Sequence, residues 1–240
     1  MGLGVEATGV SKSYGGKVAL ANVSLKVEPG GLLAVLGPSG SGKSTLLYVL
    51  NGLERQDSGE VKFTESSGMT VDDAALRRMT TLLLQRSVML RDSVYGNVAY
   101  GLRLRGMDEK LIQPRVSSAL RDMGLQGFEK RRASTLSGGE MQRIAFARAA
   151  VLEPKVIFLD EFTANLDPPN IKLLESALAD FRAKTGCTVI LVSHNPFQAQ
   201  RLARQCIYLY QGEVMFSGSI EAAREQKDER MGAFFRGDLS

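Results

Sequence analysis

The chain lacks the features that mark a membrane-spanning or disulfide-bonded protein. Among its 240 residues are two cysteines, one histidine and no apolar run of 18 residues, so no segment is expected to span a membrane. The first residues, MGLGVEATGV, lack the basic start and apolar core of a signal peptide. Cys187 and Cys206 stand in apolar, strand-like stretches, which favours buried thiols in a reducing compartment. We therefore expect a cytoplasmic protein.

The charge excess is small. Lysine and arginine number 30 against 26 aspartate and glutamate residues, a net charge of +4. Basic clusters such as 130–132 could favour nucleic acid or an anionic membrane surface, but most such clusters are solvated faces. Hydrophobic residues make up 44% of the chain, which suffices for the core of one large domain.

The most informative stretch is 32–50. A short apolar run, 32–36, breaks into GPSGSGKS at 37–44, and apolar residues then resume at helical spacing. This order predicts strand, loop and helix, and the spacing fits the phosphate-binding pattern G-x4-G-K-[ST]. Lys43 would reach the β and γ oxygens of a nucleotide, Ser44 could hold Mg²⁺, and the start of the helix favours an anion. Gly-Ser-rich segments are also ordinary loops, but the flanking strand and helix favour nucleotide binding.

Two elements near this loop carry polar side chains of interest. The first 28 residues alternate as strands do, and 58–63 predicts a strand that returns to the same antiparallel layer. Tyr14 stands in a Gly-flanked turn, where its ring either lies in solvent or receives a purine base. A helix at 72–79 leads to an apolar strand at 81–84, and Gln85 follows it directly. Its amide suits a metal ion or a water, or it simply caps the strand.

The composition changes between 86 and 132. Glycines punctuate short helical stretches here, many arginines stand between the apolar positions, and no catalytic constellation is present. We interpret this segment as an inserted helical subdomain that meets a partner.

LSGGE at 136–140 opens a second helix. Ser137 and Glu140 fit a capping box, which accounts for these two residues. The double glycine, Gly138 and Gly139, would expose the backbone at a helix N-terminus, which indicates a second anion site.

Two further strands end in polar residues. The run 156–161 predicts a buried parallel strand that ends in Asp160 and Glu161, where Asp160 would approach Mg²⁺ and Glu161 the attacking water. ANLD at 164–167, followed by two prolines, predicts a loop that starts a helix. His194 follows a strand at 187–192; a lone histidine is usually structural, but the end of a parallel strand is where ligand groups gather.

Taken together, Tyr14, the 37–44 loop, Gln85, LSGGE, VIFLDE at 156–161, ANLD and His194 resemble the nucleotide-binding subunit of an ATP-binding-cassette transporter, from about Val5 to Gly218. The resemblance implies an ATPase with an α/β fold: a P-loop NTPase core with a mostly parallel sheet, an N-terminal antiparallel β layer and an inserted helical subdomain. It implies one domain over 1–240, with the core and β layer in 1–85 and 133–240 and the helical subdomain in 86–132.

The resemblance also assigns roles in binding ATP and Mg²⁺. Tyr14 would stack on adenine, and Ser44, Gln85 and, through water, Asp160 would bind Mg²⁺. The residues implied to hold the phosphates are Gly37, Pro38, Ser39, Gly40, Ser41, Gly42, Lys43, Ser44 and Thr45.

Catalysis would combine residues of two subunits. Glu161 would polarise the attacking water and His194 would contact the γ-phosphate, with Gln85 and Lys43 assisting. Two cassettes would pair head to tail, so Ser137, Gly138 and Gly139 of the opposite subunit would close each site and Asp167 would couple the two sites. This explains the second anion site. Two departures from the family pattern are Phe162, where proline is common, and Leu84, where phenylalanine is common.

The implied partners are integral membrane permease subunits, a second copy of the chain and, indirectly, a substrate-binding protein, with no nucleic acid. The chain would lie peripherally on the cytoplasmic face of the inner membrane, with 86–101 as the surface that receives the permease. Segment 87–106 and ANLDPPN are most similar to ATPases of tungstate-type oxyanion importers. Molybdate, phosphate and polar amino acid importers are alternatives, as is a cassette ATPase of the cell-division type. The intact Glu161 and His194 disfavour a nucleotide-sensing scaffold.

Overall fold

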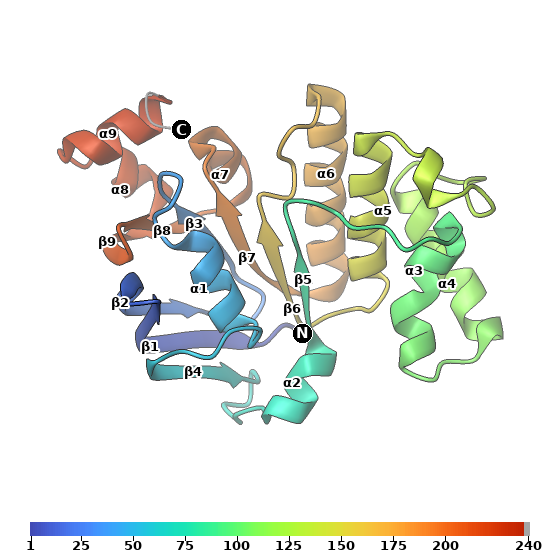
Figure 1. Cartoon of the computed structure of the whole chain (residues 1–240), viewed down its shortest axis with the longest axis horizontal. Helices are drawn as coiled ribbons and strands as arrows, with labels where there is room; N and C mark the ends of the chain where they lie inside the picture. The colour runs from blue at the N-terminus through green and yellow to red at the C-terminus, as the bar shows by residue number, and fades with distance from the viewer. Residues whose placement is uncertain (238–240) are drawn as a thin grey trace. The chain divides into compact units, whose positions relative to one another are not determined.

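The computed structural model describes residues 1–237, and of residues 73 and 74 the backbone alone. The chain forms two compact units. The first comprises 1–82, 155–161 and the residues from 186 onward, and the second comprises 83–154 and 162–185. The elements of both units are labelled in Figure 1.

A three-stranded antiparallel sheet opens the first unit. Its strands are β1 (Gly4–Tyr14), β2 (Lys17–Val27) and β4 (Ser58–Thr64), in the order β2-β1-β4. Alternation of apolar and polar residues buries one face of β2, with Leu25 and Val27 inward and Lys26 outward. The predicted antiparallel layer and the return of segment 58–63 to it are confirmed.

The second sheet has six strands. Its order is β5 (Thr80–Leu83), β6 (Val156–Asp160), β7 (Thr188–Ser193), β3 (Leu32–Leu36), β8 (Gln205–Tyr210) and β9 (Glu213–Ser219). Strands β6, β7, β3 and β8 are parallel, and β9 runs antiparallel to β8. Every residue of β3, β6 and β7 is buried, as in parallel sheets that are covered on both faces. The carboxyl ends of these three strands share one edge, and the phosphate loop, Glu161 and His194 follow them there.

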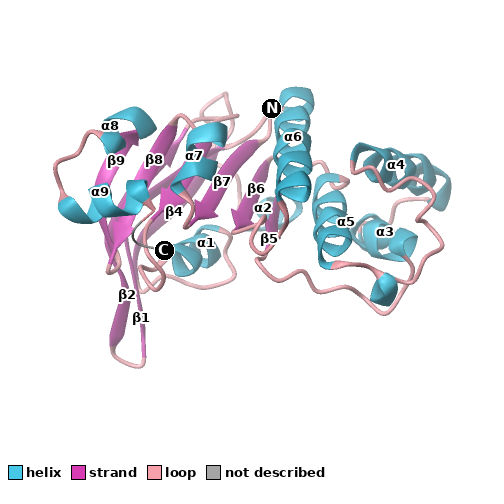
Figure 2. Cartoon of the chain, turned by 90° about the horizontal axis from the view of Figure 1, so that it is seen from above, coloured by secondary structure: helices cyan, strands magenta, loops and turns pink. Residues whose placement is uncertain are grey.

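Helix α1 (Lys43–Leu50) joins the two sheets. It contacts β2 of the first sheet and β6 and β7 of the second, and its apolar side chains belong to one core cluster with residues of both sheets. The other helices of the unit are α2 (Asp73–Met79), α7 (Pro196–Leu202), α8 (Ile220–Arg224) and α9 (Glu229–Arg236). Figure 2 shows α7, α8 and α9 beside strands β7 to β9. Phe234 of α9 packs on Tyr208 of β8, with 5.4 Å between the ring centroids.

The second unit is helical. It contains α3 (Val94–Leu104), α4 (Glu109–Asp122), a 3-10 turn (Ala133–Thr135), α5 (Gly138–Ala150) and α6 (Pro168–Thr185). Helix α5 contacts α3, α4 and α6, and Phe146 of α5 packs edge-on against Phe181 of α6. The predicted inserted helices, α3 and α4, are present, and α5 and α6 belong to the same compact unit. The predicted domain boundaries at 86 and 132 stay a prediction. Among the described residues, no helix has the length and apolar character needed to cross a membrane.

Candidate nucleotide site

The phosphate loop connects β3 to α1, and its shape depends on glycine. Gly37 has φ of 145° and Gly42 has φ of 101°, values that side-chain-bearing residues rarely adopt. A Cβ at Gly37 would collide with the carbonyl oxygen of Leu209, and one at Gly42 would lie 2.5 Å from the carbonyl oxygen of Ala19. Gly40, with φ of 75°, has no atom within 4 Å of its Cβ position. The loop is thus packed on the backbone of β2 and β8 on one side and open on another.

Lys43 holds its ammonium group against this loop. Its Nζ donates hydrogen bonds to the carbonyl oxygens of Gly37 at 2.8 Å and Pro38 at 2.7 Å. Burial lowers the pKa of Lys43, while the nearby charges of Glu161 and Asp160 raise it. The cation therefore lies within the loop at the positive end of α1, where two features favour an anion.

Ser44 and Asp160 form an oxygen-rich corner beside the loop. The Ser44 hydroxyl donates to Oδ1 of Asp160 at 3.3 Å, and Asp160 is buried at the end of β6. Burial raises the pKa of Asp160, and the charge of Glu161 adds to this, while Ser44 and Lys43 oppose it. A hydroxyl and a carboxylate in contact are hard oxygen donors, which suit Mg²⁺ when waters and phosphate oxygens complete its coordination.

Glu161 meets the single histidine of the chain. Oε1 of Glu161 lies 2.9 Å from Nδ1 of His194. The Glu161 backbone has φ of 46°, the left-handed region that residues other than glycine seldom occupy, and its N–H donates to the carbonyl oxygen of Val192 at 3.0 Å. This turn directs the carboxylate toward the end of β7. Strained backbone of this kind concentrates at functional sites.

Tyr14 ends β1 in the turn between β1 and β2. The residue is 45% exposed, and the Lys12 ammonium lies over its ring. The first unit thus holds the predicted phosphate loop with Lys43 and Ser44, and also Tyr14, Asp160, Glu161 and His194.

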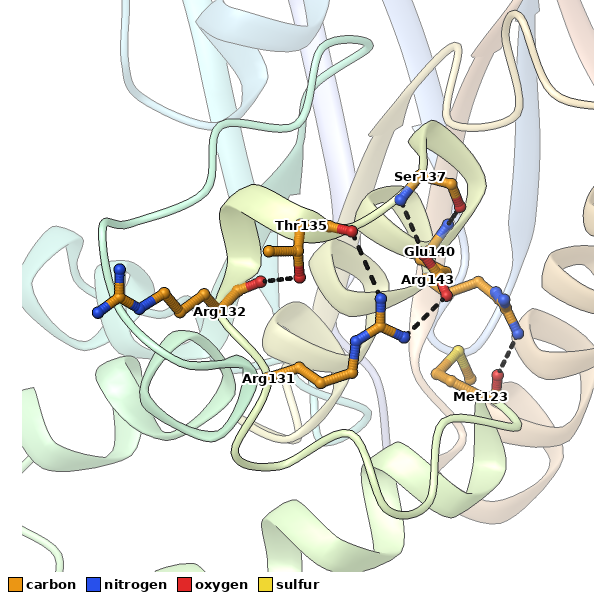
Figure 3. Close-up of polar contacts among 7 residues, drawn as sticks. All are labelled: Met123, Arg131, Arg132, Thr135, Ser137, Glu140 and Arg143. Atoms are coloured by element: carbon orange, nitrogen blue, oxygen red, sulfur yellow. Dashed lines mark hydrogen bonds and ion pairs between the residues drawn. The ribbon is translucent and has the colours of Figure 1, made fainter.

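The second unit holds the signature segment. Ser137 caps α5 as predicted: its backbone N–H donates to Glu140 at 2.7 Å, and the Glu140 N–H donates to the Ser137 hydroxyl at 3.3 Å (Figure 3). Arg131 lies 3.3 Å from Glu140 and stacks on the ring of Phe128. The Ser137 N–H, with Arg131 in support, lowers the pKa of Glu140. The helix start is therefore fixed by charge as well as by its cap.

The two signature glycines differ in their surroundings. A Cβ at Gly138 would meet nothing within 4 Å, so the backbone there is open. At Gly139 it would lie 2.7 Å from Nδ2 of Asn170. Asp167 holds this asparagine, because its Oδ1 accepts hydrogen bonds from the Asn170 N–H at 2.9 Å and from Nδ2 at 2.7 Å. Asp167 therefore caps α6, a local role that we did not predict; its role across a dimer stays a prediction.

Gln85 belongs to the second unit, lies two residues after the end of β5 and is exposed. The predicted Mg²⁺ ligands thus come from both units, with Ser44 and Asp160 in the first.

Comparison with known proteins decides the family. A family model described as ABC transporter matches residues 20–164. The chain belongs to the ABC transporter family. It is accordingly an ATPase of the kind whose ATP hydrolysis drives transport.

Individual ABC transporter proteins resemble the chain over nearly its whole length. The tungstate uptake system ATP-binding protein TupC of Peptoclostridium acidaminophilum is 35% identical, over 88% of this chain and 96% of that protein. The spermidine/putrescine import ATP-binding protein PotA of Pasteurella multocida is also 35% identical, over 98% of this chain but 64% of that protein. The solved structure of CbiO1 from Clostridium perfringens, part of the ABC transporter complex CbiONQ, superposes with a TM-score of 0.82 at 27% identity, covering 97% of this chain and 94% of that one.

One residue of this ABC transporter ATPase was not singled out from sequence. Gln142 of α5 is buried, accepts a hydrogen bond from the Ser87 hydroxyl at 2.6 Å and donates one to the carbonyl oxygen of Phe162 at 2.7 Å. It thereby joins the segment after Gln85 to the segment after Glu161. The signal was available, since Gln142 shares the buried face of α5 with Ala145, Phe146 and Ala149.

The same contact explains the departure at Phe162. The hydrogen bond uses its carbonyl oxygen, which a proline also has, and the Phe162 ring is fully buried 6.4 Å from the ring of Phe146. The side chain fills the core of the second unit, while the backbone acceptor does not depend on it.

Proposed function

We propose that this chain is the ATP-hydrolysing subunit of a bacterial ABC importer for an oxyanion such as tungstate. Two of the similar proteins are ATP-binding subunits of uptake or import systems, and the tungstate protein matches over 96% of its own length. The observation that carries the ATPase part is the pairing of Glu161 with His194 at 2.9 Å beside an intact phosphate loop.

ATP would bind with its phosphates on the loop and Tyr14 against adenine. Lys43 would turn from the carbonyls of Gly37 and Pro38 to the β and γ oxygens. Glu161 would orient and polarise the attacking water, and His194, which holds the carboxylate through Nδ1, would present its other nitrogen to the γ-phosphate. Such a reaction needs positioning and charge neutralisation more than covalent chemistry.

Mg²⁺ would be held by Ser44, Gln85 and, through water, Asp160, and it would supply charge neutralisation at the phosphates. The contact between Ser44 and Asp160 supports the first and last of these assignments.

The second anion site would serve a partner copy. The open backbone at Gly138 and the ordered start of α5 suit a phosphate from an opposite, head-to-tail subunit, with Ser137 and Gly139 beside it. Asp167, which already orders Asn170 next to Gly139, would transmit closure of one site to the other.

Segment 86–101 would receive a membrane permease on the cytoplasmic face of the inner membrane. Two of its apolar residues are exposed, Val88 at 72% and Tyr100 at 46%. The substrate would reach the permease on a binding protein and would not touch this subunit.

The substrate assignment is tested in vesicles. The chain is reconstituted with its permease and binding protein, and ATP hydrolysis is measured with tungstate, molybdate, phosphate or spermidine. We expect stimulation by tungstate, and none with the Glu161→Gln subunit. Stimulation by spermidine alone would mean that the transported substrate is a polyamine and not tungstate. A polyamine is the second candidate because the chain is as similar in sequence to PotA as to TupC, at 35% identity to each. Hydrolysis indifferent to every compound would refute the oxyanion assignment and leave the ATPase intact.

A further inference from the structure

A cation, the ammonium group of Lys12, lies over one face of the Tyr14 ring. The Nζ of Lys12 lies 5.2 Å from the centroid of the Tyr14 ring, within the range of a cation–π contact. The Lys12 side chain is only 13% exposed, whereas Tyr14 is exposed, at 45% for the residue as a whole. The ring therefore presents an accessible surface while the lysine beneath it is covered.

The ammonium group of Lys12 is anchored to the segment that follows α1. It donates a hydrogen bond to the Arg55 carbonyl oxygen at 2.7 Å and lies 3.7 Å from Glu54 and 3.6 Å from Asp57. Two carboxylates thus balance its charge, which makes Lys12 a poor attractant for phosphate.

Asp57 completes the connection between this segment and β1. Its carboxylate accepts the Ser13 N–H at 2.7 Å, and its own N–H donates to the carbonyl oxygen of Ser11 at 2.8 Å. Residues 11–14 are therefore tied at three positions to 54–57, which continue from the helix that begins at the phosphate loop. The tyrosine ring and the loop are parts of one connected framework.

We propose that Lys12 is the positioning residue for the base subsite. Its ammonium covers one face of Tyr14, holds the ring at a fixed separation from the phosphate loop and leaves the other face for adenine. This inference rests on the proposed stacking of adenine on Tyr14.

A positioning role predicts an effect on base binding alone. Tripolyphosphate carries the phosphates of ATP without the base, so it reports on the phosphate loop and not on Tyr14. A lysine that merely stabilised the fold would alter both affinities together, through the fraction of folded protein.

The experiment measures the affinities of the full chain for ATP and tripolyphosphate by calorimetry, each with Mg²⁺. We expect Lys12→Met to weaken ATP binding about five- to tenfold, which is the size of loss expected when a partly desolvated cation–π contact is removed. Tripolyphosphate binding should stay within about twofold of the wild-type value. Lys12→Gln, whose amide can still donate to the Arg55 carbonyl, gives the same selective loss if Lys12→Met folds poorly. Lys12→Arg keeps a cation over the ring and restores ATP binding.

The matched control is Lys26→Met, which removes another lysine ion pair from the same sheet, 2.8 Å from Glu28, without touching Tyr14. It leaves both affinities unchanged. Equal losses for ATP and tripolyphosphate, or no loss for ATP, would overturn the role of Lys12. Tyr14→Ala tests adenine stacking separately from the role of Lys12. If this variant loses ATP affinity while Lys12→Met does not, stacking on Tyr14 stands and only the role of Lys12 fails. If Tyr14→Ala leaves ATP affinity unchanged, the base does not stack there and both proposals fail.

Discussion

The contact between Gln142, Ser87 and Phe162 allows a quantitative test of the second unit. Gln142→Met keeps the length of the side chain and removes both of its hydrogen bonds, at 2.6 Å and 2.7 Å. The half-buried Ser87 hydroxyl can turn to water, but the Phe162 carbonyl oxygen loses the side-chain donor that it has in a buried setting.

The expected cost follows from these two losses. A hydrogen bond contributes about 0.5–1.5 kcal/mol net, and a buried acceptor left unpaired costs about 1–3 kcal/mol. The free energy of unfolding should therefore fall by about 2–4 kcal/mol. For a chain of this size that corresponds to a melting temperature lower by roughly 4–16 °C.

Thermal unfolding of wild type, Gln142→Met, Ser87→Ala and the double variant measures the effect. Ser87→Ala should cost little once Gln142 is replaced, so the two changes should be coupled by about 1 kcal/mol. Gln113→Met, at an exposed position of α4, is the control for the substitution itself. A melting temperature for Gln142→Met within about 2 °C of the control, or additive effects with Ser87→Ala, would refute the reasoning.

Four other outcomes are expected. Lys43→Ala removes the cation of the phosphate loop and should abolish ATP retention in equilibrium dialysis; unchanged affinity would contradict the loop assignment. Glu161→Gln should trap an ATP-bound dimer on size-exclusion chromatography with little turnover, and near-normal hydrolysis would mean that another group activates the water. Tyr100→Ala should weaken capture of the chain by its permease more than basal hydrolysis, and intact capture would move the permease surface elsewhere. Burial raises the pKa of the Cys206 thiol to about 12, so little reactive thiolate forms at pH 8. Ellman's reagent should therefore label the native protein far more slowly than the urea-unfolded protein, in which the buried Cys187 also becomes reactive. Equally fast labelling of both would contradict the burial of these thiols.

Elements with strong local patterns could be predicted from the sequence. The strand, loop and helix at 32–50 were predictable because five buried strand residues, a glycine loop and an apolar helix face are contiguous. Boundaries shifted slightly, as with the strand predicted at 81–84 and observed as β5 at Thr80–Leu83. The capping box at Ser137 was equally local and is confirmed.

Contacts between distant segments were not predictable in this way. Lys12 looks like any polar strand residue until the fold brings Glu54 and Asp57 to it. A helix start after ANLD was predicted, but Asp167 itself was assigned only a role across the dimer; the structure shows that it also caps α6 by accepting the Asn170 N–H. The roles of the signature residues came from the resemblance, while those of Lys43, Ser44, Asp160 and Glu161 were also indicated by local motifs. All of these roles stay predictions.

The packing of the phosphate loop changes how its glycines should be interpreted in comparisons among variants. At Gly37 and Gly42 any side chain would collide with a backbone carbonyl oxygen, that of Leu209 or Ala19 respectively, so only glycine fits. A selection for folded protein alone would retain both, even in a lineage that had lost ATP. Gly40, with open space around it, is restricted by its backbone conformation only and is the position whose retention reports more on the bound nucleotide. A glycine in a ligand-binding loop can thus be retained because neighbouring backbone leaves no room for a side chain, and not because the ligand requires it.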